Sequence, residues 1–159
     1  MGTASRMPSR RRSDSPASRS AGSEVGRILA LDPGTVRIGI AVTDAAGIVA
    51  HPRGFLVADD PAVLQQIADL VAELAVDRIL VGLPTGLSGI EGAAAVAARE
   101  FAAEVEEGTG VPVELIDERF TTAIAERSLI ETGTRRKRRK QVRDGAAAAV
   151  LLQGYLERE

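Results

Sequence analysis

Short apolar runs and longer amphipathic segments alternate along the chain. The apolar runs are bounded by turn residues and predict strands at about 25–31, 37–43, 48–57, 78–83 and 111–116. The first three follow one another through tight turns, which is typical of an antiparallel meander. Pro52 and Gly54 interrupt the third run and indicate an edge strand or a bulge.

Helical spacing of apolar residues predicts helices at about 61–74, 91–107, 121–131 and 142–156. Asp60 is expected to cap the first helix, with Pro61 as its first residue. Gly108 and Gly110 are expected to end the second. This order of elements predicts an α/β fold, in which a mixed five-stranded sheet carries helices on both faces. The run at 78–83 does not alternate, so it suits a central parallel strand.

The 159 residues predict one folded domain at 25–159, preceded by an Arg/Ser-rich tail at 1–24 that we expect to be disordered. The tail has no apolar core of a secretory signal, and no apolar run approaches the roughly 20 residues of a membrane span. The chain has no cysteine, which excludes disulfides, thiolate metal sites and thiol nucleophiles. We therefore expect a cytoplasmic protein with no membrane contact.

Basic residues are concentrated in two segments of the chain. Residues 135–143 hold seven basic and no acidic residues, and residues 1–27 hold six Arg. The remainder carries seven basic against twenty acidic residues. Such clusters favour binding to nucleic acid, and a solvated loop is the alternative. The predicted nucleic-acid contacts are Arg37, Arg135, Arg136, Lys137, Arg138, Arg139, Lys140 and Arg143. For Arg37, an ion pair with Asp44 or a solvated face is an equal alternative.

Three acidic residues occupy positions where a metal site could form. Asp32 and Glu118 each follow an apolar strand, and Asp144 precedes the apolar part of the last helix. Sites in open sheets form at the carboxyl ends of strands, and hard divalent cations prefer carboxylate ligands. Each acid also has a structural alternative: a turn residue for Asp32, a solvated charge beside Arg119 for Glu118, and a helix cap for Asp144.

Other candidate residues carry weaker signals. Asp117 could substitute for Glu118, although adjacent strand residues point to opposite faces. Residues 82–86 could pass the backbone close to a ligand or simply form a turn. His51 is expected at the surface or the sheet edge. Thr121 and Thr122 are expected first as helix caps and second as phosphate contacts.

Four segments together resemble the YqgF/RuvX family. They read LALDPGTVRIGIAVTD, ILVGLPTGLSGIEG, VPVELIDERFTTAIAE and RKQVRDGAAAAVLLQGYL. The family comprises RNase H-like proteins described as pre-16S rRNA nucleases and Holliday-junction-resolvase-like proteins. The segments come in the family's order and spacing and cover essentially all of the chain after residue 27.

The resemblance implies an RNase H-like fold whose catalytic and metal-binding acids are Asp32, Glu118 and Asp144. It implies hydrolysis of phosphodiester bonds with Mg²⁺ or Mn²⁺, in maturation of the 5′ end of pre-16S rRNA. The implied partners are pre-rRNA and the small ribosomal subunit, with branched DNA as an alternative, and the protein is expected as a monomer or homodimer. The chain departs from the family at Pro33, Ile90, Gly145 and Ala146. Of these, Gly145 is expected to loosen the start of the last helix and the placement of Asp144.

Three other functions stay open at this stage. One is a Holliday-junction resolvase in DNA recombination and repair, and another is a non-catalytic RNA-binding factor for ribosome assembly. The third is a nucleotide-binding module, because LDPGT also resembles the first phosphate hairpin of actin-like ATPases. Those proteins need a second such domain, for which 159 residues leave no room.

Overall fold

The computed structural model describes residues 26–84, 92–118 and 136–158, and for residues 136–144 the description is of the backbone. The strands are β1 (Arg27–Pro33), β2 (Arg37–Thr43), β3 (Ala50–Val57), β4 (Val76–Leu83) and β5 (Val113–Asp117). The helices are α1 (Val63–Glu73), α2 (Ala93–Thr109) and α4 (Arg136–Arg158). The predicted tail at 1–24 and the predicted helix at 121–131 lie outside the described residues.

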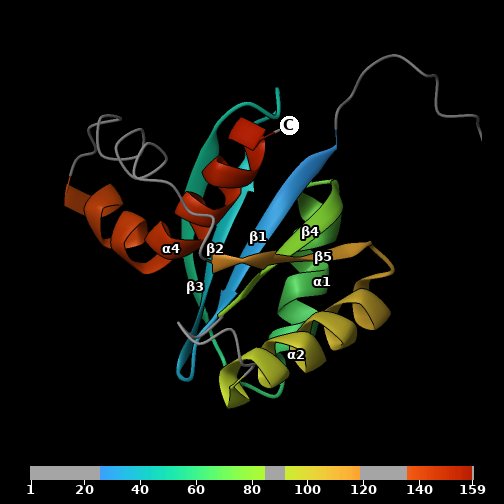
Figure 1. The fold of residues 1–159 in the computed structure, drawn as a ribbon. Helices are drawn as coiled ribbons and strands as arrows, with labels where there is room; N and C mark the ends of the chain where they lie inside the picture. The colour runs from blue at the N-terminus through green and yellow to red at the C-terminus, as the bar shows by residue number, and fades with distance from the viewer. Residues whose placement is uncertain (1–25, 85–91, 119–135, 159) are drawn as a thin grey trace, which may run out of the picture.

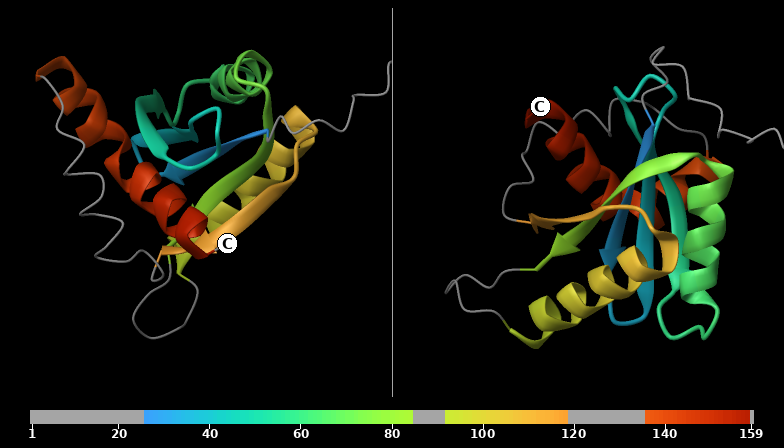
Figure 2. Two further views of the ribbon diagram at one scale, coloured as in Figure 1. Left: turned by 90° about the horizontal axis from the view of Figure 1, so that it is seen from above. Right: turned by 90° about the vertical axis from the view of Figure 1, so that its right-hand side faces the viewer.

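The five strands form one mixed sheet in the order β3-β2-β1-β4-β5. β2 pairs antiparallel with β1 and β3, whereas β4 pairs parallel with β1 and β5. Helices α1 and α2 cover one face of the sheet and α4 crosses the other (Figures 1 and 2). The predicted α/β architecture is therefore confirmed. The carboxyl ends of β1, β4 and β5 meet at one end of the sheet, where β2 begins and β3 ends.

The two faces of the sheet are packed with side chains of different size. On the α1/α2 face, large aliphatic residues of the strands, among them Leu29, Leu31 and Ile79, form the main core. On the α4 face, Ala30 and Ala41 lie opposite one another in register and belong to a cluster with Ala148 and Ala149 of α4. Small side chains on both partners let the helix backbone come close to the sheet.

The closest approach of α4 to the sheet is at Gly145. A Cβ built on this residue would lie 2.6 Å from the Ile40 carbonyl oxygen, 3.0 Å from Pro52 Cβ and 3.2 Å from the Arg53 nitrogen. The expectation that Gly145 loosens the helix start is wrong, because α4 begins at Arg136 and Gly145 lies well inside it. The glycine is there because no side chain fits between the helix and β2.

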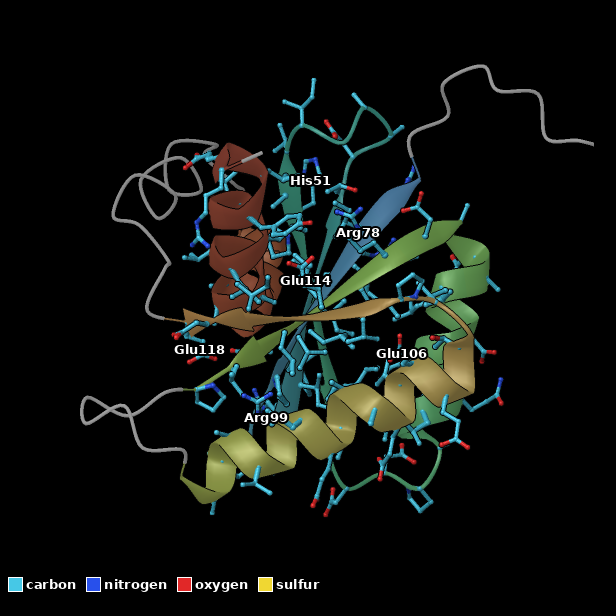
Figure 3. All side chains as sticks on the ribbon, turned by 45° about the vertical axis from the view of Figure 1, so that its right-hand side comes forward. His51, Arg78, Arg99, Glu106, Glu114 and Glu118 are labelled. Carbon is cyan, nitrogen blue, oxygen red and sulfur yellow. The ribbon has the colours of Figure 1, made fainter. Side chains whose placement is uncertain are left out.

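A polar network fastens the other end of α4. Arg78 of β4 donates a hydrogen bond to the Tyr155 hydroxyl, which in turn donates to a Glu114 carboxylate oxygen at 3.2 Å. Figure 3 shows Arg78 and Glu114 near this part of the helix. Tyr155 is only 7% exposed, so its hydroxyl needs such partners. The helix is thus held at two points along its length.

Several element boundaries differ from the prediction. α1 begins at Val63 rather than Pro61, but the Asp60 carboxylate still accepts a hydrogen bond from the Ala62 N–H at 2.8 Å. Gly108 lies inside α2, and only Gly110, at φ 69°, ends that helix in the left-handed conformation. β3 is an edge strand with a register shift, as Pro52 and Gly54 indicated. Among the described residues, no helix is long and apolar enough to cross a membrane.

The contact at Gly145 predicts an unusual sign for a glycine-to-alanine substitution in a helix. In an open helix, alanine is favoured over glycine by about 0.5–1 kcal/mol. Gly145→Ala should instead lower the free energy of unfolding by about 1–3 kcal/mol, because its methyl group meets the backbone of β2. Urea denaturation measures the difference.

Gly108→Ala is the matched control. A Cβ at Gly108, also helical and exposed, would meet nothing within 4 Å, so this substitution should be neutral or stabilising. If both variants were more stable than wild type, Gly145 would not lie against the backbone of β2.

Candidate active site

Asp32 stands at the carboxyl end of β1, on the face that α4 covers. Ile28 and Ala30 pack in the α4-side cluster, whereas Leu29 and Leu31 pack on the other face, so alternation assigns Asp32 to the α4 side. The turn after it is closed by backbone atoms, with the Gly34 N–H donating to the Arg37 carbonyl at 2.8 Å. Asp32 is half-buried. A partly buried carboxylate without a partner is unfavourable, so the Asp32 side chain needs a partner.

That partner is Glu118, the residue after β5. Ile116 packs in the α4-side cluster, so Glu118, two residues on, faces the same way. A hydrogen bond joins the carboxyl groups of Asp32 and Glu118. Figure 3 shows Glu118 at the end of β5 where the carboxyl ends of the strands gather. The structure thus brings together two of the three predicted acids, from strands that are not neighbours.

Gly82 of β4 lies between the two acids. Its absent side chain is what lets them meet, because a Cβ there would lie 3.1 Å from Glu118 Oε1 and 3.4 Å from Asp32 Oδ1. Sequence reasoning gave Gly82 only as part of a turn or loop, whereas it belongs to β4. The signal that could have identified it is a glycine inside a continuous apolar strand, which often marks a close approach.

The proximity of the two acids changes the chemistry of Glu118. Partial burial is the largest cause, and together with the hydrogen bond and negative charge of Asp32 it raises the pKa of the Glu118 carboxyl from an ordinary 4.5 to about 7. The charge of Asp117 acts in the same direction. At neutral pH the pair is therefore poised between holding a proton and carrying both negative charges.

The structure describes Asp144, on α4, by its backbone alone, and its side chain lies outside the description. Asp144 immediately precedes Gly145, which approaches the Ile40 carbonyl. Ile40 pairs with Leu31, the residue before Asp32. The helix backbone at Asp144 is therefore brought to the level of the strands where Asp32 stands. The described side chains contain no group of three potential metal ligands, so the third ligand stays a prediction.

Arg37 begins β2 at the same end of the sheet as the two acids. Its predicted alternative, an ion pair with Asp44, is wrong, because Asp44 follows β2 at the opposite end. The Asp44 carboxylate instead accepts hydrogen bonds from the N–H groups of Ile48 and Val49, at 2.8 and 3.3 Å. The bond from Ile48 is the main reason that the pKa of Asp44 lies below its usual value.

The basic segment differs from the prediction in its backbone. We expected a loop before a helix starting near residue 142, but α4 already begins at Arg136. Arg136, Lys137, Arg138, Arg139, Lys140 and Arg143 therefore stand on its first turns, and Arg135 lies outside the described residues. Their contacts with nucleic acid stay a prediction. Thr121 and Thr122 also lie outside the described residues.

The structure places two of the weaker candidates, Asp117 and His51, away from the acid pair. Asp117 shares its side of the sheet with Leu115, which packs against the α1/α2 core, so it is not positioned to substitute for Glu118. His51 is exposed on the edge strand β3, as predicted (Figure 3).

The donor set fits a hard divalent cation. Two half-buried carboxyl groups offer oxygen ligands within one hydrogen bond of each other. Magnesium is commonly held by one or two carboxylates together with water and substrate phosphates. A cation here would replace the proton of Glu118 and neutralise both charges.

The sequence matches one family model and relatives that carry a common name. A family model described as "RuvX: Holliday junction resolvase" matches residues 26–158. A relative from Mycobacteroides abscessus named "Putative pre-16S rRNA nuclease" is 44% identical over 83% of this chain and 81% of its own. A protein of the same name from Moorella thermoacetica is 42% identical over 83% of this chain and 95% of its own.

A solved structure supports the fold. The chain resembles RuvC of T. thermophilus, solved in complex with a Holliday junction substrate, with a TM-score of 0.55. The sequence identity is 14%, and the match covers 84% of this chain and 94% of RuvC. The likeness establishes the RNase H-like architecture. Together with the family match, it identifies the chain as a member of the RuvX family of Holliday-junction-resolvase-like nucleases.

Proposed function

We propose that this protein is a metal-dependent endonuclease that matures the 5′ end of pre-16S rRNA during ribosome biogenesis. Asp32 and Glu118 hold the Mg²⁺ or Mn²⁺ ion, and Asp144 completes the ligand set. The observation that carries the proposal is the carboxyl pair that meets across Gly82. Two carboxyl groups kept in contact at a half-buried strand end are costly for stability alone, so we assign them a ligand.

The chain's own residues would bind and orient the reacting groups. A divalent cation supplies charge stabilisation at the phosphodiester and lowers the pKa of water. Glu118 would hold the ion and help to position the attacking water, and the raised pKa of its carboxyl belongs to the metal-free protein. Asp32 would hold the same ion from the opposite side of Gly82. Basic residues Arg37 and Arg136–Arg143 would hold the substrate backbone, since the rest of the chain is acidic.

The choice of pre-rRNA rests on the names of the relatives, and the small ribosomal subunit is the partner it implies. The second candidate is a resolvase for branched DNA, which the description of the matching family favours. Resolving a junction requires two sites related by two-fold symmetry, and therefore a dimer. A non-catalytic RNA-binding role would leave the Asp32–Glu118 pair without a function.

Removing the charge of Asp32 should abolish cleavage. Labelled pre-16S rRNA and a four-way DNA junction are each incubated with wild type or Asp32→Asn, in Mg²⁺ or EDTA. Cleavage of the RNA should depend on Mg²⁺ and fall by more than about 100-fold in the variant, because groups that merely orient metal ligands are already worth about 10- to 100-fold. An asparagine can keep the hydrogen bond to Glu118, so the fold should persist.

Asp69→Asn provides the matched control, since this aspartate is exposed on α1 and accepts a hydrogen bond from the Gln65 side chain. It should cleave like wild type. Cleavage of the junction alone would favour the resolvase, and RNA binding with no cleavage in any metal would favour the assembly factor. Full activity of Asp32→Asn would contradict the metal site.

The raised pKa of Glu118 predicts that the metal-free protein loses stability with rising pH. Between about pH 4.5 and 7 the folded state binds more protons than the unfolded state, so the free energy of unfolding decreases as pH rises. Urea denaturation in EDTA at pH 5 and pH 8 should show a larger loss for wild type than for Glu118→Gln. Adding Mg²⁺ should restore stability at pH 8 and not at pH 5. If the free energy of unfolding changed equally with pH in the two proteins, the pKa of Glu118 would not be raised in the folded state.

Filling the space at Gly82 should weaken cation binding while keeping the fold. The methyl group of Gly82→Ala would lie between the oxygens of Asp32 and Glu118, and its contact with Leu151 Cδ2 at 3.6 Å is ordinary packing. The Mg²⁺ concentration for half-maximal thermal stabilisation should rise at least about tenfold. Gly108→Ala should leave it unchanged. Equal metal affinity in both variants would mean that the cation does not sit between the acids.

A further inference from the structure

A second feature lies on the same face of the sheet as Asp32, two strands away. Asp32 pairs with Gly39 of β2, and Gly39 pairs with Phe55 of β3. Residues paired across neighbouring strands share a face, so Phe55 is on the side of the acids. Neighbouring strands lie about 4.8 Å apart, which puts the Phe55 backbone about 10 Å from that of Asp32. Gly39, between them, has no side chain.

Arg37 is stacked on Phe55. Arg37 pairs with Val57, two residues beyond Phe55, so the arginine and the ring share one face as a diagonal pair. The guanidinium carbon lies 4.3 Å from the centroid of the Phe55 ring. Arg37 is exposed, Phe55 is half-buried and Val57 is 45% exposed. The charged group is therefore at the surface, and the ring below it restricts where it points.

Stacking suits this arginine to binding a phosphate. A guanidinium over an aromatic ring can donate through the N–H groups along its rim, and this planar group matches two oxygens of a phosphate. The ring also limits the rotamers of the arginine before a ligand arrives, which lowers the entropy cost of binding. The nearby anionic pair, Asp32 and Glu118, repels a phosphate. A fixed positive charge beside the pair offsets this repulsion.

We propose that Arg37 and Phe55 form a phosphate-binding subsite that holds the nucleic-acid strand next to the cleaved phosphodiester. Arg37 contacts a neighbouring phosphate, and Phe55 is a positioning residue that acts through Arg37. The bound strand then runs across the sheet from the acid pair toward β3. This inference rests on the proposed nuclease function and adds the path of the substrate to it.

The experiment compares substrate binding and steady-state cleavage of the RNA under saturating Mg²⁺. Arg37→Gln should raise KM about tenfold at nearly unchanged kcat, because it removes a charge-assisted contact away from the reacting atoms. It should also reduce the slope of log affinity against log salt by about 0.7–0.9. Arg37→Lys should keep the salt slope and still raise KM, because lysine lacks the planar group.

Phe55 variants separate positioning from a structural role. Phe55→Leu should raise KM about 2- to 5-fold, with unchanged kcat, half-saturating Mg²⁺ and salt slope. Phe55→Tyr keeps the ring and should restore wild-type KM. A thermal melt in EDTA checks that Phe55→Leu is folded. If it is not folded, the KM of Phe55→Tyr compared with that of wild type still tests the need for the aromatic ring.

Arg158→Gln serves as the control for net charge, since Arg158 is exposed in the last turn of α4 and lies outside both basic segments. It should keep the wild-type salt slope and KM. A wild-type KM and salt slope in Arg37→Gln, with cleavage still dependent on Mg²⁺, would overturn the subsite and leave the nuclease function intact. A wild type that neither binds nor cleaves nucleic acid would overturn both.

Discussion

The contact between the Asp32 and Glu118 carboxyl groups is the constraint on which the site depends. Two acids repel each other once ionised, and here the contact is kept because the pairing of β1, β4 and β5 fixes the two backbones. β1 and β4 are apolar on both faces, so their ends have little freedom to move apart. The stability of the sheet thus holds together a pair that would separate in water, and a proton or a cation relieves the strain.

Glycine is used twice where backbones and site residues must come close. At Gly82 the missing side chain leaves room between the two acids, and at Gly145 it lets α4 reach the Ile40 carbonyl. The alanine layer between α4 and the sheet has the same effect, because large residues there would hold the helix farther from the sheet. The network of Arg78, Tyr155 and Glu114 then fixes the far end of α4. The backbone carrying Asp144 is positioned by this packing.

Much of the fold could be read from the sequence because it is encoded locally. Apolar runs and turn residues identified all five strands and the helices α1 and α2, and the two strand-end acids did come together. The start of α4 was missed, because a run of basic residues has helix propensity but no apolar face to reveal it. Gly82 was underrated, since its role depends on the register of β1, β4 and β5, which no local pattern encodes.

The electrostatics of the acids and of Arg37 are complementary. An acidic pair attracts a divalent cation but repels the polyanion that the enzyme must bind, and both effects are strongest where the pair is partly buried. Phe55, over which Arg37 lies, has its backbone about 10 Å from that of Asp32 across Gly39, so the arginine is near enough to attract the same strand. Placing the two charges on separate strands lets each keep its role. On the proposed path, the nucleic-acid strand crosses Gly39, which has no side chain, between the acid pair and Arg37.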